Sequence, residues 1–231
     1  MYRIFSISHS VRILLFLFLS YILFSGFRDV SNTAQTQTRD SAEIHSIAVL
    51  PFVNMSTDKS QEYFSDGIAE EILNALAKIE GLRVAARTSS FTFKGRNKDI
   101  PTIGERLNVD YVLEGSGRKD GAMIRISVQL IKVEDGFHLW SNSYDREFKN
   151  VFVIQDEISR AIVSALKVKL VGAGHSPLVE APTKDMEAYE AYLKGRFFWN
   201  QRGSGLKKGV IFFEQALEKD PVSKRTVVIK A

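Results

Sequence analysis

Apolar and polar residues occur along this chain in blocks that predict an α/β domain. A nearly uninterrupted apolar run at residues 47–52 predicts a strand buried on both faces. A polar turn follows, and apolar residues then recur at every third or fourth position, which predicts an amphipathic helix. The apolar helix positions are Phe64, Ile68, Ile72, Leu76 and Ile79. We expect this strand and helix to form one packing unit that the later elements cover or extend.

The expected helix carries polar residues near its amino end. Ser65 or Asp66 is placed to cap it, because side chains of these types accept hydrogen bonds from free N–H groups of the first turn. Glu70 and Glu71 follow in the first turns, where the helix dipole favours carboxylates. Adjacent helical side chains point about 100° apart, so two neighbouring carboxylates do not converge on one substrate atom. We therefore interpret this pair as solvated charges.

Similar patterns continue through the next hundred residues. They predict strands at residues 82–86, 111–116, 124–130 and 137–144, a short helix from Pro101 to Leu107 and a long helix at residues 151–170. The dipeptide Asp120-Gly121 predicts a hairpin turn between two of these strands. The expected fold class is α/β, with a mixed sheet and two main helices in the order β-α-β-α-β-β-β-α.

Two strands of this region have distinct faces. Residues 124–130 alternate between apolar and polar side chains, so one side of the sheet is expected to face water or a polar partner. In the next strand, one face carries His138, Trp140, Asn142 and Tyr144. We interpret this stripe as the core face of the strand, with a binding surface as the alternative.

An uncharged apolar segment, residues 13–27, lies near the amino terminus and predicts contact with a membrane. Arg3 and Arg12 precede it, which by the positive-inside rule places the short amino end in the cytoplasm. No clear small-x-small cleavage site follows, so we favour an uncleaved anchor over a cleaved signal peptide. The chain is then a single-pass protein of the inner (cytoplasmic) membrane, with its folded part on the periplasmic, extracytoplasmic side.

The expected domain organisation has six parts. They are an anchor or signal segment (1–28), a flexible linker (29–43), an α/β domain (44–171), a second linker (172–185), a helical hairpin (186–221) and an irregular tail (222–231). The hairpin consists of helices at residues 186–201 and 206–219 around a short Gly-Ser-Gly turn. One such hairpin cannot bury its own apolar face, so it needs further repeats or a neighbour.

The first hairpin helix combines aromatic and Arg side chains on one face. Tyr189, Tyr192, Arg196 and Trp199 follow one another at spacings i, i+3, i+7 and i+10. A separate stripe of small residues suits packing on the second helix. Aromatic and Arg side chains that are exposed together are typical of protein interfaces. We predict that this face binds a protein partner; the alternative is that a neighbouring helix covers it.

Composition narrows the possible chemistry. The 231 residues include no Cys, which excludes disulfides, Cys-zinc sites, iron–sulfur clusters, thiol catalysis and a lipid-anchored amino-terminal Cys. The four His are scattered and show no metal-ligand spacing. A net charge of +4 is mild, and Lys and Arg are interleaved with Asp and Glu, so nucleic-acid binding is not expected.

Glycine-rich motifs add no catalytic signal. Gly115-Ser116-Gly117 with Gly121 departs from a dinucleotide loop, because a strand and not a helix follows. Gly203-Ser204-Gly205 lacks the full Gly-x-Ser-x-Gly elbow and a preceding strand. We predict no catalytic, cofactor-binding or metal-binding residues and no small-molecule cofactor.

Several strings resemble the TolB-like amino-terminal domain found in bacterial adenylate-cyclase-related and tetratricopeptide proteins. The resemblance covers about residues 44–171. Its strings are Ile47-Ala48-Val49-Leu50-Pro51-Phe52, Tyr63-Phe64-Ser65-Asp66-Gly67-Ile68-Ala69-Glu70-Glu71, Leu113-Glu114-Gly115-Ser116, Leu139-Trp140-Ser141, Tyr144-Asp145-Arg146 and Gln155-Asp156-Glu157-Ile158. The resemblance implies an α/β sheet domain that follows a membrane span and precedes tetratricopeptide repeats.

The hairpin is similar to a first tetratricopeptide repeat. The matching small, aromatic and proline positions are Gly195, Phe198, Gly209, Phe213, Ala216 and Pro221. In that family the first helix lines the binding groove, and this implies that Tyr189, Tyr192, Arg196, Trp199 and Asn200 bind the partner. Relatives often carry a cyclase domain or a DNA-binding winged helix, and neither activity is carried over here.

These features together predict a membrane-anchored, non-catalytic protein-interaction module. The alternative is a sensory or accessory fragment of a class III adenylate cyclase or transcriptional regulator system, which acts beside a separately encoded effector. A second alternative is a hydrolase that uses the carboxylates of the α/β domain, among them Asp66.

Overall fold

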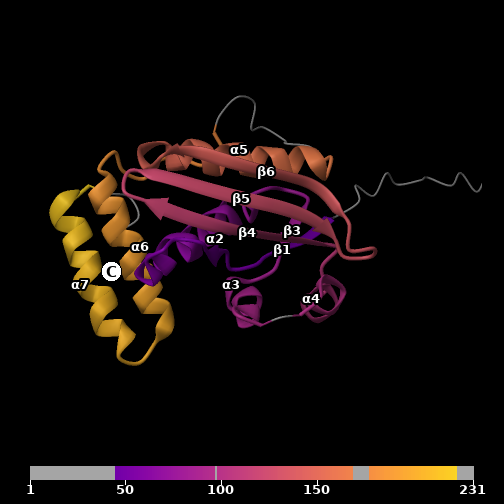
Figure 1. Cartoon of the computed structure of the whole chain (residues 1–231), viewed down its shortest axis with the longest axis horizontal. Coiled ribbons are helices and arrows are strands. Elements are labelled where there is room, and N and C mark those ends of the chain that lie inside the picture. The colour runs from indigo at the N-terminus through magenta and orange to yellow at the C-terminus, as the bar shows by residue number, and fades with distance from the viewer. Residues whose placement is uncertain (1–44, 97, 169–176, 223–231) are drawn as a thin grey trace, which may run out of the picture. The chain divides into compact units, whose positions relative to one another are not determined.

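A mixed six-stranded sheet organises the described part of the chain, which in this computed structural model comprises residues 45–96, 98–168 and 177–222 (Figure 1). The strands run in the order β3-β1-β4-β5-β6, and β2 pairs with β4 beyond the end of β1. They are β1 (His45–Val49), β2 (Val53–Asn54), β3 (Leu82–Val84), β4 (Tyr111–Asp120), β5 (Met123–Lys132) and β6 (His138–Glu147). β1 lies parallel to β3 and β4, whereas β4, β5 and β6 are antiparallel. The mixed sheet predicted from the sequence is confirmed.

Six α-helices belong to the described residues. They are α2 (Glu62–Leu76), α3 (Arg87–Ser90), α4 (Ile100–Leu107), α5 (Val151–Ala165), α6 (Met186–Gln201) and α7 (Gly205–Lys219), with 3-10 turns η1 (Lys59–Gln61), η2 (Phe91–Phe93) and η3 (Phe148–Asn150). The predicted order is found, with β2 and α3 as additions. Pro51 interrupts the first strand because proline has no N–H to donate, and pairing with β4 resumes at Val53.

The two faces of the sheet are covered unequally. α2 and α5 pack on one face and bury the main apolar core, while η2 and α4 cover one end of the other (Figure 1). The smaller core on that second face consists of Ala48, Leu50, Phe93, Ile103, Val109 and Val112. Beyond it, Arg125, Ser127 and Gln129 of β5 are exposed or half-buried, which confirms the predicted polar face.

The predicted caps of the first long helix are wrong. α2 begins at Glu62, directly after η1, whose first turn is capped by the Asp58 carboxylate. Ser65 and Asp66 therefore lie inside the helix and are buried. Gly117 of β4 permits this close approach, because a Cβ there would lie 2.7 Å from the Ser65 hydroxyl oxygen. The Ser65 hydroxyl donates to the Gly117 carbonyl at 3.2 Å.

The aromatic stripe of β6 is only partly a core face. Tyr144 is buried and Trp140 packs against the core, whereas His138 and Asn142 are exposed. A register shift between Leu130 and Ile131 of β5 lies beside the first residues of β6. The interpretation of this stripe as the core face of the strand therefore holds for Trp140 and Tyr144.

Several predictions fall on residues that the structure does not describe. These include the membrane segment at 13–27, the linker at 29–43 and most of the tail at 222–231. Among the described residues, no helix has both the length and the apolar character needed to cross a bilayer. The long helix expected at residues 151–170 ends at Ala165.

The helical hairpin forms as predicted, with α7 starting one residue earlier than expected. Its small residues allow close packing, since a Cβ at Gly195 would lie 2.5 Å from the Phe213 ring. Residues 177–185 are not a free linker, because the N–H groups of Leu178 and Val179 donate to the Asp156 carboxylate. The domain boundaries themselves stay predictions.

Candidate functional site: the junction between the helical hairpin and the α/β domain

The aromatic face of α6 is covered by the rest of the chain. Tyr189 is 1% exposed and Tyr192 is 8% exposed. The Tyr189 ring lies 4.5 Å from that of Phe152 between centroids, and its hydroxyl accepts a hydrogen bond from the Gln155 amide at 3.1 Å. For these two tyrosines the alternative interpretation, that a neighbouring helix covers the face, therefore holds. The neighbour that the hairpin needs is the α/β domain itself, through α2 and α5.

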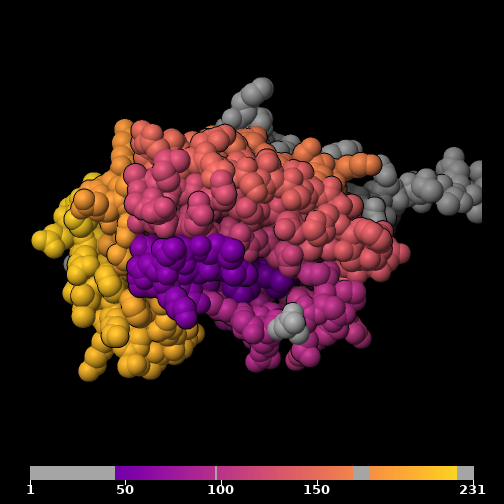
Figure 2. Space-filling model, in the orientation of Figure 1, coloured from indigo at the N-terminus to yellow at the C-terminus, as the bar shows by residue number. Residues whose placement is uncertain are grey.

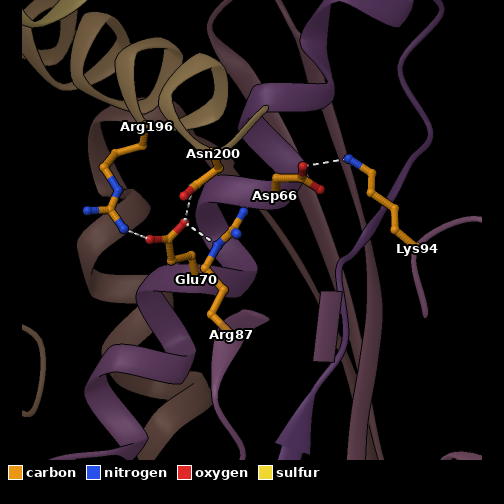
Figure 3. A network of polar contacts seen from close by, with 6 residues as sticks. All are labelled: Asp66, Glu70, Arg87, Lys94, Arg196 and Asn200. Atoms are coloured by element: carbon orange, nitrogen blue, oxygen red, sulfur yellow. Dashed lines mark hydrogen bonds and ion pairs between the residues drawn. The ribbon is translucent and has the colours of Figure 1, made fainter. Parts of the chain in front are cut away.

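A buried carboxylate on α2 joins three elements through charge (Figure 3). The Glu70 side chain is 6% exposed and forms an ion pair with Arg196 of α6. Arg87 of α3 donates to Glu70 Oε2 at 2.8 Å, and Asn200 of α6 donates to the same oxygen at 3.3 Å. The interpretation of Glu70 and Glu71 as solvated charges is therefore wrong, since both residues are buried. In this cluster, Glu70 on α2 is therefore held by one residue of α3, Arg87, and by two residues of α6, Arg196 and Asn200.

Asp66 stands one helical turn before Glu70 and makes a second charged contact. Lys94, from the loop after η2, donates to Asp66 Oδ2 at 2.5 Å and lies 2.7 Å from the Glu62 carboxylate. Burial raises the pKa of Asp66 above its ordinary value, and the Lys94 ammonium offsets part of that effect. The same ammonium lies 5.5 Å above the ring of Phe197. Lys94 thus touches both α2 and α6.

A third charged contact lies at the amino end of α6. Glu190 accepts hydrogen bonds from Tyr63 of α2 at 2.7 Å and from Lys119 of β4 at 2.6 Å, and Lys194 lies 2.9 Å away. Burial alone would raise the pKa of Glu190, but the donors outweigh it and lower the pKa from 4.5 to about 2. The ionised form of Glu190 is therefore favoured by the docked hairpin.

We expect Glu190 to make the stability of the protein fall in acid. The folded pKa lies below the unfolded one, so the stabilising contribution is present above about pH 4.5 and is lost as the pH falls toward about 2. Urea unfolding between these pH values measures it. Glu190→Gln should flatten the dependence of the free energy of unfolding on pH. The exposed carboxylate of Glu214 offers the control, and an equal flattening by Glu214→Gln would contradict the assignment.

The five residues predicted to bind a partner occupy three different environments. Tyr189 and Tyr192 lie in the core, and Arg196 and Asn200 bind Glu70. Trp199 is 37% exposed at the rim, with its ring 6.1 Å from that of Phe213. Their role in binding a partner stays a prediction.

The partners in this junction could not be recognised from the sequence. Asp66, Glu70, Arg87, Lys94 and Lys119 were not connected to the hairpin, because they come from four separate elements. One local signal was present: Asp66 and Glu70 share a face of α2 at spacing i, i+4, as Arg196 and Asn200 do on α6. The described residues hold no group of three or more metal-ligating side chains placed to bind an ion. The chemistry that this site offers is charge pairing between elements.

Residues 42–161 match the family model described as HilA/YgeH-like transcriptional regulator, second domain. The chain belongs to this family. The match runs from the start of β1 into α5, so the second domain of HilA/YgeH-like regulators corresponds to the α/β domain and not to the hairpin.

A curated relative is a Rhizobium meliloti protein named "Putative adenylate cyclase 3". It is 49% identical over 152 residues, which cover 65% of this chain and 26% of the relative. The chain therefore spans about a quarter of the length of that relative. The name of this relative agrees with the resemblance of the sequence to a domain that occurs in adenylate-cyclase-related proteins.

Solved structures that are similar to part of this chain include TolB from Acinetobacter baumannii and the lipoprotein GNA1162 from Neisseria meningitidis. TolB has 17% identity and a TM-score of 0.41 over 53% of this chain and 28% of its own. GNA1162 has 18% identity and a TM-score of 0.39 over 54% of this chain and 99% of its own. Overlaps of this size assign no function. A tetratricopeptide repeat is not shown by these comparisons.

Proposed function

We propose that this chain is a non-catalytic regulatory module that binds a protein partner and serves an effector carried elsewhere. The strongest support for this proposal is that the chain is related both to a family of regulators and to a protein named as a cyclase. One family model is named for transcriptional regulators, and one relative is named a putative adenylate cyclase. Regulating transcription and cyclising ATP are different activities. A domain common to both is better explained as a shared regulatory part than as either effector.

The docked hairpin suits such a role. Its contact with the α/β domain combines an aromatic core with an ion pair whose cation remains partly exposed, since the Arg196 side chain is 33% exposed. Partly exposed charges can be reached by a partner, and interfaces within one chain that are this polar are compatible with relative motion. A partner that contacts Trp199, Arg196 and Asn200 at the rim would also act on Glu70. Tyr189 and Tyr192 would become available to it only after undocking of the hairpin.

We further propose that residues 13–27 hold the module at the cytoplasmic membrane, with the α/β domain and hairpin outside the cytoplasm. The arginines that precede this segment and the polar residues that follow support this orientation. The family relationships favour the role of a sensory or accessory part of a cyclase or transcriptional regulator system over that of a self-sufficient binding protein.

The proposal can be tested with the full chain produced in bacterial cells with a carboxyl-terminal tag. A photo-crosslinking amino acid at position 199 should attach one discrete protein, whereas the same group at Val153, which is 56% exposed on α5, should attach none. Protease added to cells with a permeabilised outer membrane should remove the tag. Equal crosslinking at both positions, a protected tag, or cyclic AMP formed from ATP by the purified chain would contradict the proposal.

A further inference from the structure

A groove of about 570 Å³ lies on the second face of the sheet, where the cover by η2 and α4 ends. One side is formed by the segment from Leu50 to Met55, which includes β2, and the other by residues 93–96 together with Lys98. Figure 2 shows the surface hollowed between the indigo residues that begin the described chain and the magenta residues of η2 and α4. A volume of this size is typical of ligand sites, which span about 300–1,000 Å³.

The β2 side of the groove offers both apolar surface and a strand edge. Val53 is 60% exposed and Met55 is 61% exposed, so together they give this side of the groove an accessible apolar surface. β3 pairs only with His45–Ile47, so within the described ranges no strand lies beside β2 on the side away from β4. The N–H of Met55 donates to Gly117 of β4, and alternate strand residues direct their main-chain groups to opposite edges. The main-chain groups of Asn54 therefore face the open edge.

The opposite wall of the groove is cationic. Arg96 and Lys98 line it, and neither forms an ion pair with any residue that the structure describes. Lys94 lines it as well, but its ammonium is shared by Asp66 and Glu62. The floor is polar, with Ser116, Ser127 and Gln129 side by side on β4 and β5, and its single carboxylate is Glu114. Negative charge on a ligand is thus favoured beside Arg96 and Lys98 and disfavoured over Glu114.

We propose that this groove binds an extended acidic peptide segment of a partner protein, which would lie between β2 and the wall formed by Arg96 and Lys98. The proposal rests on the proposed function and identifies the partner's chemistry. An extended chain can hydrogen-bond to the free edge at Asn54, as in strand addition. Its side chains alternate in direction, so acidic residues reach Arg96 and Lys98 while apolar residues contact Val53 and Met55.

Lys94 connects this groove to the hairpin. Its ammonium holds Asp66 on α2 and lies over Phe197 on α6.

Binding can be measured by fluorescence anisotropy on the full chain with the labelled peptide acetyl-Glu-Val-Glu-Val-Glu-amide. We expect saturable binding that weakens between about 50 mM and 300 mM salt, because the wall charges are exposed. The double variant Arg96→Gln with Lys98→Gln should weaken binding at least about tenfold. The control Lys149→Gln with Lys207→Gln removes the same charge from exposed sites elsewhere and should leave binding unchanged. Equal loss in both variants would overturn the proposal.

Three further arms separate a strand-addition site from a general anion site. Arg96→Glu with Lys98→Glu should bind the Lys-Val-Lys-Val-Lys peptide in place of the acidic one. Methylation of the peptide nitrogens along one edge should abolish binding, whereas methylation along the other edge should not. If free glutamate or inorganic phosphate competes as well as the peptide, or if both methylated peptides bind, the proposal is wrong. If the peptide does not bind in the groove but crosslinking is still confined to position 199, only the groove proposal is wrong and the proposed function is still supported.

Discussion

Replacement of Tyr189 with alanine is expected to lower the free energy of unfolding by about 3–5 kcal/mol, as for other buried aromatic side chains. The ring is 1% exposed and lies among Phe148, Phe152 and Tyr192, so its removal leaves a cavity between α6 and α5. Urea unfolding of the full chain measures the loss. The variant should also undock the hairpin, because this ring is the centre of its apolar contact.

Tyr189→Phe is the matched control for this prediction. It keeps the ring and removes only the hydroxyl that accepts from Gln155, so we expect a loss of about 1 kcal/mol. A loss below about 1 kcal/mol for Tyr189→Ala would show that the hairpin does not depend on this contact. If Tyr189→Ala and Tyr189→Phe lowered the free energy of unfolding equally, the hydrogen bond to Gln155, and not the ring, would be the source of the stabilisation.

Replacement of Glu70 with glutamine is expected to lower the free energy of unfolding by about 2–3 kcal/mol. Removal of one partner of a fully buried ion pair costs about 3–5 kcal/mol, and the value here is smaller because the Arg196 and Arg87 side chains are 33% and 21% exposed. The change leaves two guanidinium groups at the junction without their carboxylate. Urea unfolding at neutral pH and moderate salt provides the measurement.

An exposed ion pair provides the control for Glu70. The Glu187 side chain is 78% exposed and pairs with Lys219, so Glu187→Gln should change stability by less than about 0.5 kcal/mol. A double-mutant cycle of Glu70→Gln with Arg196→Met should give a coupling energy above about 1 kcal/mol. Independent effects of the two changes would mean that the pair does not join the hairpin to α2.

Local patterns in the sequence were sufficient for most elements of the fold. The period of the apolar residues located α2, α5, α6 and α7, and Asp120-Gly121 located the hairpin between β4 and β5. The start of α2 was predicted too late, because Ser65 and Asp66 look like caps when only the neighbouring residues are considered. Their burial depends on Gly117 and Lys94, which are distant in sequence.

The candidate site could be predicted only in part. Aromatic and Arg residues on α6 were identified as an interface, and the structure places three of them, Tyr189, Tyr192 and Arg196, against the same chain. The sequence also indicated that the hairpin needs a neighbour. It could not indicate which neighbour, because further repeats, another protein and the α/β domain would all present apolar surface to the same face.

The sequence by itself determined the longer elements and the polar second face of the sheet, since both follow from periodicity within a few residues. Only the tertiary structure decided the burial of Glu70, the pairing of Lys94 with Asp66 and the groove beside β2. The physical reason is that charge pairing acts through space: Glu70 and Arg196 are 126 positions apart in the chain, and no local pattern encodes their contact.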